Sequence, residues 1–203
     1  MAVITISREF GAGGRTLGKM VAKKLGYNLV DEDIVQMVAE RAKVSKKSVK
    51  SIEKEAGGSL LKFMNYLISQ KQINRILDSS RGYIDEEIYV NTLTEIITDL
   101  AEEDSCVIVG RGGQYVLRDH LEAFHLLLVA THDDCVKFMM DHYNMREDQA
   151  KYTIRVHGKR RRNLYRKFGK EDYDNPILYH LVLNMSKLSM EKATKVACDL
   201  VKT

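Results

Sequence analysis

The sequence of 203 residues has few of the features that keep a chain extended, cross-linked or embedded in a membrane. One proline, no tryptophan and no low-complexity stretch argue against long linkers and disordered tails. The three cysteines form no Cys-x-x-Cys pair, so we expect reduced, intracellular thiols. The chain opens without a basic leader segment, and no apolar run is long enough to span a bilayer. We therefore expect a cytoplasmic protein without a membrane partner.

The charges nearly balance. The chain has 32 Lys and Arg against 28 Asp and Glu, a formal net charge of +4, and hydrophobic residues make up 44% of it. This length and apolar content suit one domain, residues 1–203, better than two. A mild positive charge fits a nucleotide binder, a nucleic-acid binder or neither, so the placement of the charge is more informative than its sum.

Short β-branched runs alternate with segments of helical periodicity. Such alternation predicts an α/β fold with a five-stranded, mostly parallel sheet and helices on both faces. The predicted strands are residues 3–7, 27–30, 106–109, 124–130 and 180–184. Ligands bind such sheets at the carboxyl ends of the strands. Four strand ends carry suggestive residues, namely Ser7, Asp31, Arg111 and Asn184.

Helix boundaries are marked by capping residues. One helix is predicted over residues 16–25, with Gly26 ending it, and Asp31 is placed to cap the next helix. The run His132-Asp133-Asp134-Cys135 has metal-ligand residue types, but consecutive residues at a helix start cannot all face one ion, so capping is the better explanation. The remaining predicted helices are residues 133–143, residues 148–168 and a closing helix capped by Ser189.

A glycine-rich turn separates the first predicted strand from the first predicted helix. Its residues are Gly11, Ala12, Gly13, Gly14, Arg15 and Thr16. Glycines let backbone N–H groups turn inward, and the helix N-terminus adds partial positive charge. A hydroxyl in the first helical turn, here that of Thr16, can ligate Mg²⁺. The strand–loop–helix order favours a phosphate site over a plain tight turn.

This turn resembles the P-loop of nucleoside monophosphate kinases, which typically has the sequence GAGKGT. Three longer segments, ITISREFGAGGRTLGKMVAKKLGYNLVDEDIV, VIVGRGGQYVLRD and GKRRRNLYRKFGKEDYDNPILYHLVLNMSKL, resemble the cytidylate kinase-like family over essentially the whole chain. The resemblance implies a three-layer P-loop NTPase fold. It also implies ATP and Mg²⁺ as cofactors, nucleotides as substrates, and binding of ATP by the glycine-rich turn.

The sequence departs from the wider P-loop superfamily at two positions. Gly14 stands where a lysine normally reaches the β- and γ-phosphates, and Arg8 stands where the loop normally begins with glycine. Catalysis then needs another cation, because the lysine acts as a mobile point charge. Arg15 is the nearest candidate, with Arg8 and Lys19 as others. Members of the cytidylate kinase-like family themselves carry the form SREFGAGGR.

Asp31 and Arg111 are candidates for binding the phosphoryl acceptor. Asp31 can hold a magnesium-bound water or a substrate hydroxyl, with helix capping as the alternative; for Glu32 and Asp33 capping is favoured. Cytidylate kinases place an aspartate near the acceptor nucleotide, and dephospho-coenzyme A kinases have a comparable D-x-D. Arg111 resembles the arginine of the cytidylate kinase GRD segment, which binds the monophosphate bidentately, although Gly112 replaces that aspartate. We assign Arg8, Asp31 and Arg111 to substrate binding.

A basic helix carries Arg155, Lys159, Arg162 and Arg166 on one face, because they are spaced by four, three and four residues. Like charges repel, so a polyanion opposite them explains the row. The segment 145–175 resembles the mobile lid of nucleoside monophosphate kinases, and we assign catalytic roles to Arg155, Lys159 and Arg162 together with Arg15. A solvated face is one alternative. The other is an RNA-binding strip using Tyr165 and Phe168, and we do not expect nucleic acid as a partner.

The helical stretch 45–103 shows no strand signal; Ser45 is a plausible cap and Gly57-Gly58 breaks the periodicity. We expect it to be an acceptor-binding insertion, with a homodimer surface or plain packing on the sheet as alternatives. Its apolar residues at helical spacing are Leu60, Leu61, Met64, Leu67 and Ile68, followed by Ile84, Ile88, Leu93, Ile96, Ile97 and Leu100.

The sequence therefore predicts ATP-dependent phosphoryl transfer to a nucleoside monophosphate such as CMP or dCMP. Three alternatives stay open. The first is a kinase for dephospho-coenzyme A or another small alcohol. The second is a catalytically weak nucleotide-binding regulator, which the missing lysine favours. The third is an RNA-associated protein.

Overall fold

The computed structural model describes residues 2–54, 86–103, 105–170 and 172–201. The chain divides into two compact units. The first, here called the sheet unit, comprises Met1–Asp31, Ile97–Lys159 and Asp172–Thr203. The second, the helical unit, comprises Glu32–Ile96 and Arg160–Glu171. No helix in the described part of the chain is both long and apolar enough to cross a membrane.

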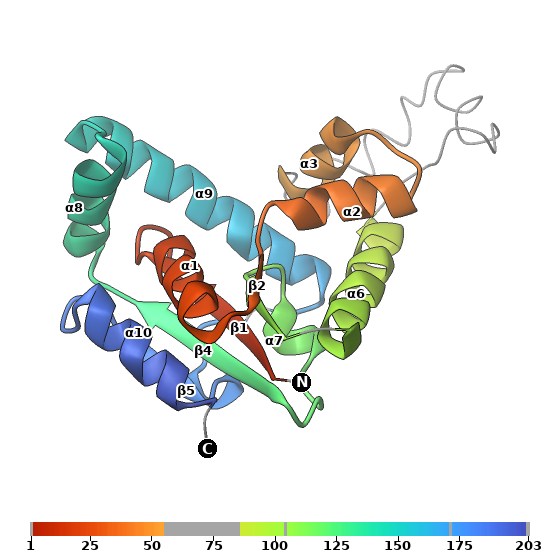
Figure 1. The fold of residues 1–203 in the computed structure, drawn as a ribbon. Helices are drawn as coiled ribbons and strands as arrows, with labels where there is room; N and C mark the ends of the chain where they lie inside the picture. Colours follow the sequence, from red (N-terminus) through yellow and green to blue (C-terminus); the bar gives the residue numbers. More distant parts are fainter. Residues whose placement is uncertain (1, 55–85, 104, 171, 202–203) are drawn as a thin grey trace. The chain divides into compact units, whose positions relative to one another are not determined.

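The sheet unit contains one five-stranded sheet with the strand order β2-β3-β1-β4-β5 (Figure 1). All four strand pairings are parallel, which confirms the predicted sheet. The predicted strand ends are correct to within one residue. The strands are β1 (Val3–Arg8), β2 (Asn28–Val30), β3 (Cys106–Val109), β4 (Ala123–Val129) and β5 (Leu181–Asn184).

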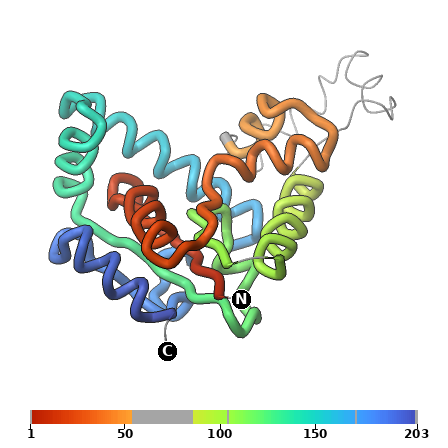
Figure 2. Tube along the Cα trace, in the orientation of Figure 1, coloured from red at the N-terminus to blue at the C-terminus, as the bar shows by residue number. Residues whose placement is uncertain are grey.

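The helices of the sheet unit follow the strands in the chain. They are α1 (Gly14–Leu25), α7 (Gly113–Val116), α8 (His132–Tyr143), the 3₁₀ turn η1 (Pro176–Leu178) and α10 (Met190–Asp199). Figure 2 shows the chain leaving β1 and turning back along it through α1. Gly26 ends α1 in the left-handed conformation, and Ser189 caps α10 by accepting a hydrogen bond from the Lys192 amide at 3.3 Å. Both predicted boundaries are confirmed.

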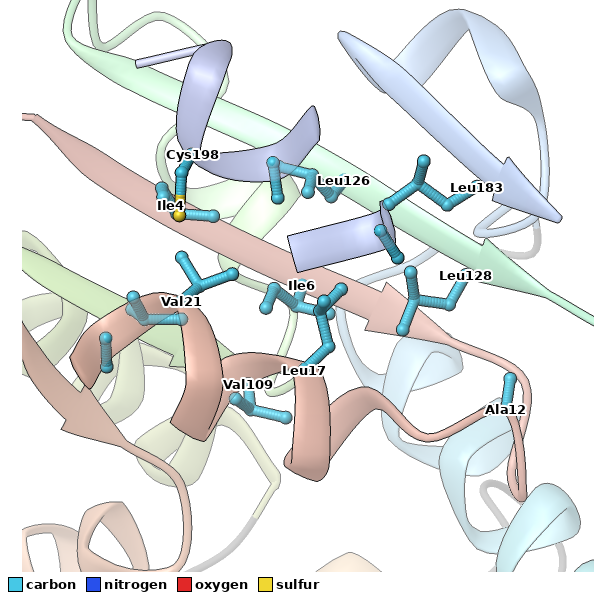
Figure 3. Packing of buried hydrophobic residues seen from close by; sticks show 14 of the residues in the cluster. Ile4, Ile6, Ala12, Leu17, Val21, Val109, Leu126, Leu128, Leu183 and Cys198 are labelled. Carbon is cyan, nitrogen blue, oxygen red and sulfur yellow. The ribbon is translucent and has the colours of Figure 1, made fainter. Parts of the chain in front are cut away.

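One face of the sheet is apolar and packs against α1 and α10 (Figure 3). Alternate residues of a strand point to opposite faces, so Ile4 and Ile6 lie on this face of β1. Helical spacing places Leu17 and Val21 of α1 opposite them, and none of these four side chains is exposed. Burial of this kind stabilises a domain by about 1.5–3 kcal/mol per large side chain. This core fixes β1 and α1, and hence the loop that joins them.

The opposite face of the same strands is partly polar. Thr5 of β1 is in register with His125 of β4, and the Thr5 hydroxyl lies 2.7 Å from Nδ1 of His125. The His125 amide also donates to Nδ1 of His180 at 3.0 Å. Burial, with the nearby charge of His180 as a second cause, lowers the pKa of His125 to about 4. His125 is therefore neutral at physiological pH.

The stability of the fold is expected to fall between pH 6.5 and pH 4 because of His125. An unfolded chain binds a proton at this histidine near pH 6.5, whereas the folded chain binds it only near pH 4. The unfolded state is therefore favoured as the pH falls through this window, by about 2–3 kcal/mol at pH 4.5. Urea unfolding of the wild type and of His125→Gln at pH 7 and pH 4.5 measures this difference. Equal losses in the two proteins would contradict it, and the exposed His132→Gln serves as the control.

The helical unit contains α2 (Asp33–Arg41), α3 (Lys46–Lys54), the first part of α6 (Glu86–Glu103) and the last part of α9 (Glu147–Lys167). The Tyr89 hydroxyl of α6 donates to Glu53 of α3 at 2.9 Å, and Lys167 of α9 pairs with Glu86 of α6. Ser45 caps α3 as predicted, accepting from the Ser48 amide at 3.1 Å.

The helical prediction for residues 45–103 is confirmed where the structure describes them. The predicted dimer stripe from Leu60 to Ile68, the glycine break and Ile84 lie outside the described residues.

Candidate functional site

The loop after β1 is shaped by two glycines in the left-handed conformation. Gly11 has φ +96° and Gly13 has φ +81°. A Cβ on Gly11 would lie 2.7 Å from Cβ of Cys135 and 3.0 Å from its carbonyl oxygen in α8. A Cβ on Gly13 would lie 2.7 Å from Cε of Met190 in α10. At Gly11 both the backbone angle and the space require glycine, whereas at Gly13 the backbone angle favours it and the Met190 methyl group is able to move.

Glu9 connects the same loop to the end of β4 by hydrogen bonds. Its amide donates to the Leu128 carbonyl at 2.9 Å, and its carboxylate accepts from the Ala130 amide at 3.0 Å. Its own carbonyl accepts from the Ala12 amide at 3.2 Å, closing the turn. No sequence pattern singles out Glu9, because its partners in β4 and after it, Leu128 and Ala130, are more than a hundred residues away.

The N-terminus of α1 lacks the usual capping groups. Gly13 occupies the cap position with no side-chain hydrogen bond, and the first turn has no acidic residue. The starts of α8 and α10 differ, because Thr131 and Ser189 cap them and each has acid in its first turn. A helix start without cap or acid keeps its amide donors and its positive dipole end available for an anion. Half-buried Thr16 lies in this first turn.

The side chain of Arg8 runs from the end of β1 across α1 toward the end of β3. A Cβ on Gly14 would lie 2.8 Å from Cγ of Arg8 and 2.9 Å from its Cδ. A Cβ on Gly110 would overlap Nη1 of Arg8. The stem of Arg8 therefore fills the space above Gly14, and its guanidinium lies against the backbone of Gly110.

The turn after β3 contains three consecutive residues in the left-handed conformation. Gly110, Arg111 and Gly112 have φ of +82°, +58° and +76°. The Gly110 amide donates to the Ile6 carbonyl at 3.0 Å, which continues the β3–β1 pairing, and α7 begins at Gly113. Left-handed φ costs about 1–2 kcal/mol at a non-glycine residue such as Arg111. The angle at position 112 also favours glycine.

Arg15 and Asp31 form an ion pair. Nε of Arg15 lies 3.0 Å from Oδ2 of Asp31, whose side chain is 14% exposed. Helix α2 begins at Asp33 after Glu32, and the Glu32 side chain makes no cap hydrogen bond. Glu32 and not Asp31 occupies the N-cap position, without a side-chain hydrogen bond, so the capping alternative for Asp31 is wrong, whereas Asp33 lies in the first turn, where an acid is favourable. The carboxylate of Asp31 instead holds the side chain of the residue that follows the glycine-rich loop.

The basic helix α9 (Glu147–Lys167) has its four predicted cations on exposed positions. Arg155, Lys159, Arg162 and Arg166 are all exposed, as their spacing predicts. The first half of α9 contacts the glycine-rich loop, because the rings of Phe10 and His157 stack with centroids 4.6 Å apart. Arg155 and Lys159 fall in the sheet unit, and Arg162 and Arg166 in the helical unit.

Two buried polar side chains near the strand ends were not assigned a role from the sequence. Ser7 of β1 is 1% exposed and Gln114 of α7 is 2% exposed. Within the described residues, the Ser7 hydroxyl and both polar atoms of the Gln114 amide have no hydrogen-bond partner. Buried polar groups are normally paired, so each of these two side chains is a candidate contact for a polar ligand or water. Gln114 follows the Arg111 turn directly, which is the only signal in the sequence that points to it.

The described residues contain no group of three or more His, Cys, Asp or Glu arranged to hold a metal ion. The capping explanation for the residues after Thr131 agrees with this, because the Thr131 hydroxyl accepts from the Asp134 amide at 3.2 Å. Cys135 is buried against Gly11. Thr16 stays the candidate ligand for Mg²⁺ by prediction.

Comparison with known proteins agrees with this fold. The model of the cytidylate kinase-like family matches residues 3–187. A solved structure of an uncharacterized protein from Eubacterium ventriosum superposes with a TM-score of 0.69 at 19% identity, covering 100% of this chain and 99% of that one. Shikimate kinase from Bacteroides thetaiotaomicron superposes with a TM-score of 0.53 at 13% identity, with 100% and 99% covered. No curated protein matches the sequence.

Proposed function

The chain belongs to the cytidylate kinase-like family, and we propose that it transfers the γ-phosphoryl group of ATP to a nucleoside monophosphate, with CMP and dCMP as the preferred acceptors. Family membership and the P-loop kinase fold support a kinase-type phosphotransferase acting on a nucleotide or other small molecule. The observation that carries the proposal is the uncapped N-terminus of α1, held behind a glycine-rich loop. In a parallel sheet this is where phosphate groups bind.

The donor phosphates occupy the glycine-rich loop in this proposal. The left-handed φ of Gly11 and Gly13 lets the loop turn closely against α8 and α10. Of the amides of residues 11–15, that of Ala12 already donates to the Glu9 carbonyl, and the others donate to phosphate oxygens. The first turn of α1 has no acidic side chain that would repel the negatively charged phosphates. Thr16 would hold Mg²⁺, which neutralises developing charge between the β- and γ-phosphates when bound. These residues position the triphosphate, and positioning with electrostatic stabilisation supplies most of the catalysis in phosphoryl transfer.

Arg111 binds the phosphate of the acceptor, and Asp31 orients its sugar or a bound water. Arg111 sits at the end of β3, next to β1 in the sheet and therefore next to the donor loop. A guanidinium suits a phosphate because it donates two parallel hydrogen bonds. In the reaction the bond from the γ-phosphorus to the β-phosphate oxygen breaks, and a bond to an acceptor phosphate oxygen forms. ADP leaves with the electron pair of the broken bond.

The exposed cations of α9 stabilise the transferring group. Arg155 and Lys159 share a helix whose His157 stacks on Phe10 of the glycine-rich loop, so this helix is attached to the donor side. Arg162, assigned with them from its spacing, falls in the helical unit. Charge on the transferring phosphoryl oxygens grows in the transition state, and cations placed there lower the barrier. The segment 145–175 would act as the lid.

A nucleotide-binding regulator without kinase activity is the second candidate, and Gly14 favours it. Position 14 offers no cation to the donor phosphates. A kinase for dephospho-coenzyme A, shikimate or another small alcohol differs from the main proposal in the acceptor alone.

Incubation with Mg-ATP and a panel of acceptors, with ADP release as the readout, separates these functions. The panel comprises CMP, dCMP, UMP, AMP, dephospho-coenzyme A and shikimate. We expect ADP release with CMP or dCMP that is at least tenfold faster than with any other acceptor. If phosphoryl transfer occurs to one of the alcohols and to no nucleotide, the protein is a kinase with an alcohol as its acceptor, and the nucleotide acceptor is wrong. Binding of ATP without turnover on any acceptor supports the regulator and contradicts the kinase.

A further inference from the structure

Gly14 is a glycine for reasons of space and not of backbone conformation. It is the first residue of α1 and is not in the left-handed conformation, so its backbone admits any L-residue. The space for its side chain is already filled. Atoms Cγ, Cδ and Cβ of Arg8 lie 2.8, 2.9 and 3.2 Å from the Cβ that residue 14 would carry. A side chain at position 14 and the present position of Arg8 exclude each other.

The guanidinium of Arg8 lies between the proposed ATP site at the start of α1 and the proposed acceptor site at the turn after β3. Its stem passes the first residue of α1, which belongs to the donor loop, and Nη1 occupies the place of a Cβ on Gly110. Gly110 opens the left-handed turn that carries Arg111. The guanidinium is therefore held between the N-terminus of α1 and the proposed acceptor turn, all within the sheet unit. A transferring phosphoryl group passes between these two elements.

Arg15 is less well placed for the same task. Its Nε is bonded to Asp31 at 3.0 Å, at the end of β2, and β3 separates β2 from β1 in the sheet. The Arg15 side chain is 46% exposed, whereas Arg8 is half-buried, so water screens the charge of Arg15 more strongly. The role first assigned to Arg15 from the sequence therefore fits Arg8 better.

We propose that Arg8 supplies the cation for the donor phosphates that P-loop kinases normally place at position 14, and that Gly14 is the space this exchange requires. The inference rests on the proposed function. A planar guanidinium donates several hydrogen bonds in fixed directions, so it binds phosphate oxygens bidentately where a lysine acts as a point charge. In the usual loop, glycine stands at the end of the strand and lysine at the start of the helix. Here the arrangement is reversed, because Arg8 at the end of β1 is the cation and Gly14 at the start of α1 has no side chain.

The first test is the affinity of Arg8→Ala for ATP and for AMP, measured by calorimetry on the full chain. We expect at least tenfold weaker binding of ATP and at most a twofold change for AMP at the donor site, since Arg8 contacts the β- and γ-phosphates. Arg8→Lys is expected to recover part of the affinity. The control is Lys23→Ala, which removes one charge from the exposed last turn of α1 and is expected to bind ATP like the wild type.

The second test is Gly14→Ala, which adds one methyl group where Arg8 lies. The added Cβ meets Cγ and Cδ of Arg8, so the stem of the Arg8 side chain must leave its present position. We expect the fold to be retained, with a midpoint of thermal unfolding at or below that of the wild type, because the added methyl group must displace this stem. ATP affinity is expected to fall at least tenfold. In an Arg8→Ala background the same Gly14→Ala change is expected to have no further effect, because the two act as one unit.

The outcomes distinguish a failure of the role proposed for Arg8 from a failure of the proposed kinase function. A wild type that binds ATP while Arg8→Ala and Gly14→Ala bind it equally well overturns the inference and leaves the kinase proposal intact. A wild type that binds no ATP overturns both. Recovery of ATP affinity in the double exchange Arg8→Gly with Gly14→Lys supports the inference, since it restores the usual arrangement of the loop. Failure of that variant while it folds like the wild type contradicts it.

Discussion

Gly11→Ala is expected to abolish ATP binding and to lower the stability of the fold by about 2–5 kcal/mol. Position 11 has φ +96°, and an added Cβ would meet Cβ, Cα and the carbonyl oxygen of Cys135. Two of these are backbone atoms of α8, which cannot rotate away as a side chain would. The loop must therefore move off α8, and its amides lose the arrangement that binds phosphate. Urea unfolding and ATP titration calorimetry measure the two effects.

Gly26→Ala is the matched control for this variant. Gly26 also has a left-handed φ, of +73°, but no atom lies within 4 Å of the added Cβ. It ends α1 at the far side from the loop. We expect a loss of about 1 kcal/mol from backbone strain alone and unchanged ATP binding. Equal ATP affinity for Gly11→Ala and the wild type would contradict the role of the loop.

Arg111→Gly is expected to lower kcat/KM for the acceptor at least 100-fold while leaving the fold more stable than Arg111→Ala. Both variants lose the same guanidinium contacts, so they should lose the same activity. They differ in strain, because glycine adopts φ +58° freely and alanine does not. The expected stability difference is about 1 kcal/mol. Steady-state kinetics and thermal unfolding of the two variants test this separation.

Lys43→Gly is the control that removes backbone strain from a left-handed residue without removing a proposed substrate contact. Lys43 also has a left-handed φ, of +53°, in the helical unit. Glycine there is expected to leave kcat/KM for the acceptor unchanged. If Arg111→Gly has wild-type kcat/KM, Arg111 does not bind the acceptor, and the strain at this turn has another cause.

Much of the donor site follows from local sequence. The β-branched run before Gly11, the glycines and the periodicity of residues 16–25 define a strand, a loop and a helix, and each signal spans only a few residues. Capping by Ser45 and Ser189 and the ends of β3 were predicted for the same reason. The row of cations on α9 follows from helical spacing alone.

The assignments within the site did not follow in the same way. The sequence left helix capping and substrate binding open for Asp31 and did not predict its ion pair with Arg15. Arg8 and Gly14 are six positions apart, and no sequence pattern predicts that the Arg8 side chain fills the space that a side chain at position 14 would need. Gln114 looks ordinary in the sequence and is nearly inaccessible in the fold.

The sequence by itself determined the alternation of strands and helices, the glycine-rich loop and the family, because these depend on residue types at short separation. Tertiary structure alone decided which cation stands beside the helix start. The ends of β1 and β3 are adjacent in the sheet although a hundred residues separate them in the chain, and that adjacency brings Arg8 against Gly110. Contacts between distant segments depend on how the hydrophobic core places the strands side by side, so no local pattern records them.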